Sequence, residues 1–201
     1  MSEFTLERFK NDIKNHVLTV NLDQGVYRDI TIGKPNTGDM RYNITTRPGY
    51  LVFTGDMGSF TFSRLEDMFN FFRGDRVNLD YWAEKLEAAD SLDGYEHYCK
   101  DKAKKEMHDW LTGFIGNLDI DDEEFREKII DATDAVKNID YSDEHSFVEG
   151  VRDWDADTAG GMDLIDFFEV GVKSYTFRYI WCCHAIVHAI RLYDESKAVA
   201  A

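Results

Sequence analysis

The chain contains little proline, little cysteine and no long apolar run. Two prolines among 201 residues, with no tract rich in serine, glycine and proline, predict no linker between separate domains. The three cysteines, Cys99, Cys182 and Cys183, favour free thiols in a reducing cytoplasm over a disulfide framework, because their number is odd and two are adjacent. The longest apolar stretch, residues 180–190, contains two histidines and is too short to span a bilayer. The opening MSEFTLERFK is polar and periodic, so we expect no signal peptide.

Basic residues are also scarce, and the shortage is local. The chain has 23 Lys and Arg against 39 Asp and Glu, a net charge of −16. Residues 106–169 contain 4 basic and 20 acidic residues, whereas residues 1–105 and 170–201 are nearly balanced, at −2 and +2. A field of this sign repels nucleic acid and attracts basic partners. We therefore expect no direct binding to nucleic acid or to a membrane, and a partner with a basic surface.

Residues 17–62 have the pattern of a small antiparallel sheet of about five strands. Alternating β-forming residues are separated by three turn signals, Asp23-Gln24-Gly25, Pro48-Gly49 and Asp56-Met57-Gly58. Short turns between strands favour antiparallel pairing. Strands are expected at residues 17–22, 26–32, 42–46, 50–54 and 60–62.

Helices are expected on both sides of this sheet region in the sequence. Residues 3–16 form an amphipathic pattern capped by Ser2, and Ser63 begins another helix with Glu66 closing a capping box. After residue 75 the chain reads as helical throughout, with the last helix apolar on most sides and therefore expected at the centre of the C-terminal half. Further helices are expected at 79–88, 95–115, 121–137, 141–151, 162–169 and 175–195, with a loop at 153–161.

These patterns predict an α+β protein. A helix and the antiparallel sheet form a subdomain over residues 1–75, and an acidic helical subdomain occupies residues 76–201. At this length the two are expected to form one compact domain.

Three motifs carry a resemblance to a known family. They are TTRPGYLVFTGDMGSFTFSRLEDMFNFFR, NLDYWAEKLEA and FRYIWCCHAIVHAIRLYDE. Together they resemble a family of uncharacterised proteins encoded by tailed bacteriophages and prophages, over most of the chain from about Val17 onward. The family supplies no catalytic residue to transfer to this sequence. The resemblance implies a phage accessory gene that is expressed in the cytoplasm of the bacterial host and acts on host machinery.

Asp153, Asp155 and Asp157 alternate like the first ligands of a calcium loop. The match then ends, because the sixth position is Thr158 rather than glycine and the twelfth is Leu164 rather than glutamate. A solvated acidic loop is the favoured interpretation, and a cation site is the weaker one.

His184 and His188 are four residues apart, so on a helix they share one face, as two zinc ligands do. The glutamate that a hydrolytic zinc helix needs is absent at position 185, which is alanine. On so apolar a helix, histidines in the core or at an interface are the favoured interpretation. The adjacent cysteines point about 100° apart on a helix and do not face one metal.

Other catalytic patterns are absent from the sequence. No cysteine or serine lies in a recognisable nucleophile motif. Residues 33–38, GKPNTG, form a turn-rich loop that is too short and irregular for a phosphate-binding loop opening a helix. We therefore expect neither an enzymatic activity nor a cofactor.

The acidic segment is the remaining signal. Its simplest interpretation is solubility, and its functional interpretation is a carboxylate surface that imitates the phosphates of a duplex and docks on a basic groove. We expect a non-enzymatic inhibitor of a host defence or nucleic-acid-processing protein, of the anti-CRISPR or anti-restriction type. The alternatives are a metal-dependent enzyme, using residues 153–157 or the His184/His188 face, and a structural or assembly protein of the virion. The residues expected to bind the partner are Asp121, Asp122, Glu123, Glu124, Asp153, Asp155 and Asp157.

Overall fold

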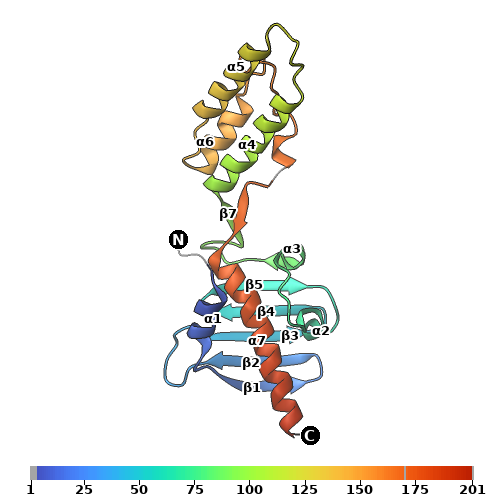
Figure 1. The fold of residues 1–201 in the computed structure, drawn as a ribbon. Helices are drawn as coiled ribbons and strands as arrows, with labels where there is room; N and C mark the ends of the chain where they lie inside the picture. The colour runs from blue at the N-terminus through green and yellow to red at the C-terminus, as the bar shows by residue number, and fades with distance from the viewer. Residues whose placement is uncertain (1–3, 170, 201) are drawn as a thin grey trace. The chain divides into compact units, whose positions relative to one another are not determined.

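The computed structural model describes residues 4–169 and 171–200 and confirms an α+β fold (Figure 1). The chain forms two compact units. The first, called the sheet unit, contains Met1–Glu96 and Tyr175–Ala201, and the second, called the helical unit, contains His97–Ser174. The chain therefore does not divide at residue 75, because its C-terminal segment returns to the sheet unit.

The sheet unit is built on a six-stranded antiparallel meander in which each strand pairs with the next. Tight turns join β1 to β2, β3 to β4 and β4 to β5, whereas a loop of eight residues leads from β2 to β3. Gly25 and Gly49 occupy the first two of these turns with φ of 66° and 81°, a region that glycine enters without strain. The five expected strands are confirmed, and β6 is a sixth that the sequence did not predict. The strands are β1 Val17–Gln24, β2 Tyr27–Gly33, β3 Tyr42–Arg47, β4 Tyr50–Gly55, β5 Gly58–Ser63 and β6 Leu86–Ala88.

The two faces of this sheet differ in polarity because side chains alternate along each strand. One face is apolar and fully buried, with Ile30, Ile44, Phe53 and Phe62 at its centre. The opposite face carries mostly threonine, serine and asparagine side chains. Among them are Thr19, Asn21, Thr31, Asn43, Thr45, Thr54, Ser59 and Thr61.

Helix α7, Phe177–Ala200, lies across the apolar face of the sheet (Figure 1). Trp181, Cys182 and Ala185 on this helix are fully buried in the same core as the strands. The expectation that this helix forms the centre of the C-terminal half is therefore wrong. The apolar face of six strands is buried only by a long helix, because the short helices beside it are too small to cover it. Those helices are α1 Leu6–Ile13, α2 Met68–Phe72 and α3 Leu79–Ala83.

Three local expectations in the sheet unit are corrected. Thr5 rather than Ser2 caps α1, and Ser2 lies outside the described residues. Asp67 rather than Ser63 caps α2, because the chain stays extended through Ser63 and pairs with β4. Residues 79–88 do not form one helix: α3 ends after one turn, and Leu86 pairs with Phe62 as part of β6.

The helical unit has three main helices, which lie side by side around one core (Figure 1). Met107, Phe147 and Phe167 are fully buried in that core. The expected helix at residues 162–169 is wrong, because only a single 3-10 turn forms there and the chain before it is irregular. The elements are β7 Glu96–Tyr98, α4 Lys100–Gly116, α5 Phe125–Asn138, α6 Glu144–Arg152, η1 Phe167–Glu169 and β8 Lys173–Tyr175, and β7 pairs with β8.

Within the described residues, no helix combines the length and the apolar character needed to cross a membrane.

Candidate functional site

Two acidic segments of the helical unit, far apart in the sequence, lie against each other. The loop at residues 153–161 follows α6 and runs back along α5. Gly160 has φ of 63°, and a Cβ atom there would lie 2.4 Å from the carbonyl oxygen of Lys128 on α5. Only glycine permits this approach of two backbones. The loop is therefore fixed directly on the helix.

A hollow of about 350 Å³ opens where the start of α5 meets this loop. Glu124 and Asp157, both expected from the sequence to bind a partner, lie together in its wall. Glu127 and Asp131 also line it and were not singled out. Their spacing of three and seven residues from Glu124 places them on the same helix face, so helical periodicity was the signal that would have found them.

A second hollow, of about 360 Å³, lies near the end of α5. Asp153 and Asp155 line it together with Asp140 and with the indole of Trp154. Trp154 donates a hydrogen bond from Nε1 to the carbonyl oxygen of Met162 at 2.7 Å, which fixes this part of the loop. The loop thus presents carboxylates beside both ends of α5.

The expected acidic residues 121–124 do not form the first turn of a helix. Helix α5 begins at Phe125, and the residues before it form turns. Lys128 Nζ donates to the carboxylate of Asp122 at 2.5 Å. This bond, and then the backbone N–H of Glu124, hold the pKa of Asp122 below its usual value. Asp121 and Glu123 are exposed and line neither hollow.

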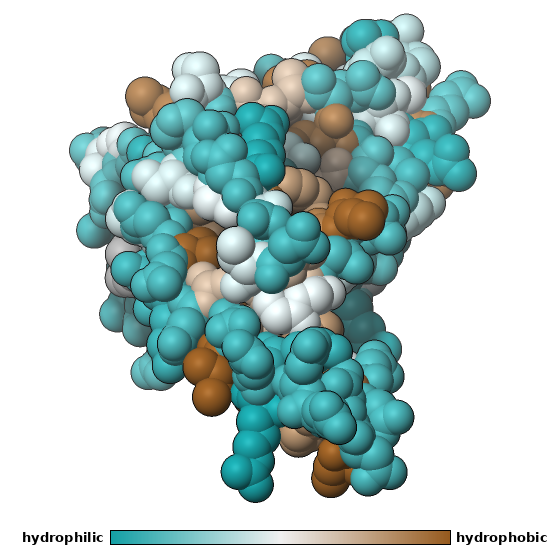
Figure 2. Space-filling view, turned by 90° about the horizontal axis from the view of Figure 1, so that it is seen from above, coloured by the Kyte–Doolittle hydropathy of each residue, from teal (hydrophilic) through white to brown (hydrophobic). Residues whose placement is uncertain are grey.

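Charge is concentrated in the helical unit. Residues 97–174 contain 9 Lys and Arg against 21 Asp and Glu, a net charge of −12 for the unit. Several of the basic residues are already paired with acidic neighbours, as Lys105 is with Asp109 and Lys137 is with Asp134. Figure 2 shows a face of the molecule on which hydrophilic residues dominate and strongly apolar residues are isolated.

The calcium-like spacing does not produce a cluster of ligands. The backbone N–H of Asp157 donates to Oδ1 of Asp155 at 3.1 Å, so this carboxylate closes a local turn. Over residues 4–169 and 171–200, no three His, Cys, Asp or Glu side chains are grouped so that they could hold a metal ion.

The two histidines of α7 face aromatic rings. His184 stacks on Phe4 with ring centroids 4.8 Å apart, and Phe9 lies 6.3 Å from His188. Burial, and then the charges of Arg191 and His16, lower the pKa of His188 to about 4. Both rings are thus held neutral and half-buried between α7 and α1, as expected for histidines that form part of a core.

The comparisons with family models, with curated proteins and with solved structures find no match to this chain. The arrangement itself places negative charge on a loop that packs directly against a helix.

Proposed function

We propose that this chain is a bacteriophage protein that inhibits a host defence or nucleic-acid-processing protein without catalysing a reaction. It acts in the cytoplasm of the bacterial host, as an inhibitor of the anti-CRISPR or anti-restriction type. The acidic face binds the basic groove that normally holds nucleic acid. It consists of seven carboxylates at the start and along one side of α5 and in the loop, those of Glu124, Glu127, Asp131, Asp134, Asp153, Asp155 and Asp157. The observation that carries the proposal is the joining of Glu124 and Asp157 in one hollow of a unit with a net charge of −12.

The spacing of the carboxylates supports imitation of a duplex. Glu124, Glu127, Asp131 and Asp134 extend over roughly 15 Å of a helix that rises ~1.5 Å per residue. A duplex presents about nine phosphates over that length, at one per ~1.7 Å. The three aspartates of the loop raise the number of carboxylates to seven, and Lys128 and Lys137 offset two of these charges. The net density is roughly half that of the duplex.

Rigidity supports the same conclusion. A DNA-binding protein contacts about 6–10 phosphates, so a surface of this density competes for part of such a footprint. The contact between Gly160 and Lys128 fixes the loop on α5 before any partner is bound. Charges that are placed in advance lose less conformational entropy on binding than charges on a mobile segment.

The experiment compares two charge-reversed variants with the wild type in a pull-down from host lysate, followed by a DNA-competition assay on the captured protein. The test variant is E127K/D131K/D157K. The control, E66K/D75K/E87K, changes the charge equally on exposed residues of the sheet unit. Only the test variant should lose the partner, and the wild type should lose it at high salt.

Two results would overturn the proposal. Equal loss in both triple variants would show that total charge, and hence solubility, is the relevant property. Capture of a partner whose binding to DNA is unaffected by this protein would exclude competition for its nucleic-acid groove.

A further inference from the structure

The polar face of the sheet carries a hollow of a different character from the acidic ones. It has a volume of about 540 Å³ and lies between the paired ends of β1 and β2 and the loop that leads to β3. None of the described residues in its lining is an aspartate or glutamate, although the chain has 39 of them. Two cations are present instead. The lining residues are Val17, Thr19, Thr31, Gly33, Lys34, Pro35, Asn36, Thr37, Gly38 and Arg41.

A buried threonine lies in the wall of this hollow. Thr31 is only 8% exposed, and its Oγ1 accepts hydrogen bonds from Asn21 Nδ2 at 2.9 Å and from Asn43 Nδ2 at 3.0 Å. The amide of Asn21 is itself held by the carboxylate of Asp29 at 2.7 Å. Two accepted bonds occupy both lone pairs of the hydroxyl, so its proton remains to be donated. The hydroxyl group of Thr31 can therefore still donate one hydrogen bond.

The two cations of the hollow are unpaired. Neither Lys34 nor Arg41, both of which the structure describes, makes an ion pair or a side-chain hydrogen bond. Arg41 lies across the end of β2, where a Cβ atom on Gly33 would come within 3.1 Å of its Cγ. Glycine at this position thus makes room for the arginine side chain beside the sheet.

The loop that carries these cations is held in a strained shape. Asn36 and Met40 have φ of 63° and 51°, in the left-handed region that side chains rarely adopt. The backbone of Met40 is fixed on both sides, since its N–H donates to Asp56 Oδ2 at 2.9 Å and its carbonyl contacts His16 Nε2 at 3.0 Å. Strain that the surroundings maintain is typical of segments that position a ligand.

We propose that this hollow binds a small phosphate monoester. A guanidinium, an ammonium and a hydroxyl group with a proton left to donate are the donors that a phosphate dianion takes. The volume is within the range of small-molecule sites and exceeds what phosphate alone would fill. Val17 and Pro35 supply apolar wall for the organic part of the ester. The site is independent of the acidic face, because it lies wholly within the sheet unit.

Nuclear magnetic resonance titration of the labelled full chain tests the proposal at low salt. The probes are inorganic phosphate, adenosine 5′-monophosphate and adenosine. The monophosphate should shift the amides of residues 31–41 and saturate, phosphate should shift the same amides more weakly, and adenosine should shift none. Saturation by adenosine alone, or no shift with the monophosphate, would overturn the proposal.

Variants show whether the named groups carry the binding. K34A/R41A should weaken the binding of the monophosphate by roughly tenfold or more, because charge-assisted hydrogen bonds are lost. The control K10A/R64A removes the same charges from exposed positions of the sheet unit and should bind as the wild type does.

T31V should also weaken binding, and T31S should restore it. Equally weakened binding in K34A/R41A and K10A/R64A would show that only the net charge of the protein matters, and it would overturn the proposed site. The triple variant of the acidic face should bind the monophosphate normally, so the two proposals fail separately.

Discussion

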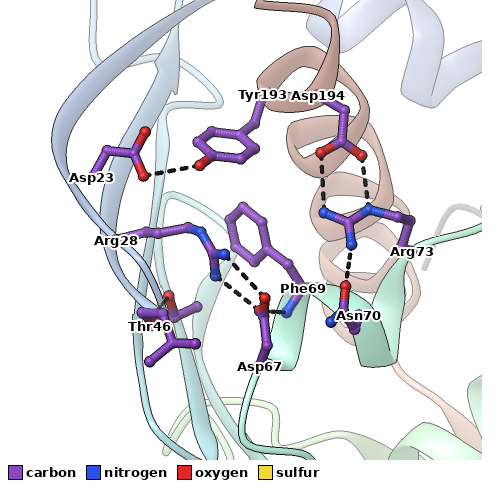
Figure 3. Close-up of polar contacts among 10 residues, drawn as sticks. Asp23, Arg28, Thr46, Asp67, Phe69, Asn70, Arg73, Tyr193 and Asp194 are labelled. Atoms are coloured by element: carbon purple, nitrogen blue, oxygen red, sulfur yellow. Dashed lines mark hydrogen bonds and ion pairs between the residues drawn. The ribbon is translucent and has the colours of Figure 1, made fainter. Parts of the chain in front are cut away.

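Arg28 on β2 donates two hydrogen bonds to the carboxylate of Asp67, at 2.8 and 3.0 Å (Figure 3). Its guanidinium lies 4.5 Å from the centroid of the Phe69 ring. Asp67 also caps α2 by accepting from the N–H of Phe69 at 3.0 Å. Although burial raises the pKa of Asp67, the hydrogen bonds from Arg28 and Phe69 lower it below its usual value. One carboxylate thus joins the sheet to α2.

Replacing Arg28 with methionine should destabilise the sheet unit by about 3–5 kcal/mol, because it leaves a partly buried carboxylate without its cation. The measurement is urea denaturation followed by hydrogen exchange of the β2 and β3 amides. The matched control is Arg73→Met, which breaks the bidentate pair with Asp194, whose two side chains are each 41% exposed. The control should lower the free energy of unfolding by at most about 1 kcal/mol. Equal losses in the two variants would contradict the argument that burial makes the Arg28–Asp67 pair the more important one.

The low pKa of His188 predicts that the folded protein loses stability in weak acid. Its pKa of about 4 in the folded chain lies below the value of ~6.5 for an unfolded histidine. Between these values the unfolded chain binds more protons, so stability is complete above about pH 6.5 and falls as the pH approaches 4. The melting temperature should fall over this range, and H188Q should flatten the curve. H145Q, at an exposed histidine of the helical unit, should keep the wild-type dependence. An unchanged curve for H188Q would assign the effect to other groups.

The strands of the meander were predictable because their determinants are local. Gly25 and Gly49 close turns between segments whose alternation is visible in the sequence, and each strand pairs with its neighbour. Strand β6 was missed because it depends on a distant partner. Trp82 and Leu86 are four residues apart and fit one helix face, yet Leu86 pairs with Phe62, and this contact overrides the local preference.

The position of α7 was missed for a related reason. Its uniform apolarity correctly predicted burial, and Trp181 and Ile186 are indeed buried. Periodicity does not identify the surface against which a helix packs. The only indication in the sequence was the size of the predicted sheet, whose apolar face needs a long helix to bury it. The sequence predicted Glu124 and Asp157 as partner-binding residues but not that they line one hollow. Their common hollow depends on the approach of Gly160 to the backbone of Lys128, which no charge pattern encodes.

The three cysteines should react at very different rates. All three are free, and Cys182 and Cys183 are fully buried, which raises the pKa of both thiols. Cys99 is half-buried, and a hydrogen bond from Ser174 lowers the pKa of its thiol. A thiol reagent at neutral pH should label Cys99 first, because the thiolate is the reactive form. C99S should abolish the fast phase, and the other two should react only on unfolding. Fast labelling of Cys182 or Cys183 in the native protein would contradict their burial.

Gly160→Ala should release the acidic loop from α5. The new Cβ would lie 2.4 Å from the carbonyl oxygen of Lys128, so the loop must move away from the helix. Gly161→Ala is the matched control, because its φ of 89° is also unfavourable for alanine while nothing lies within 4 Å of the added atom. The control should cost about 1–2 kcal/mol through backbone strain alone. Gly160→Ala should cost more, with faster hydrogen exchange in residues 153–161.

The same pair of variants tests whether the acidic face depends on its geometry. Neither substitution changes a charge, so a partner attracted by net charge alone would bind both variants equally. A partner that recognises the joined carboxylates should bind Gly160→Ala more weakly than Gly161→Ala, and the difference should appear in the dissociation rate, since the long-range attraction that sets the association rate is unchanged. Surface plasmon resonance on the captured partner measures both rates. Equal dissociation from the two variants would show that the contact between the loop and α5 has no part in recognition.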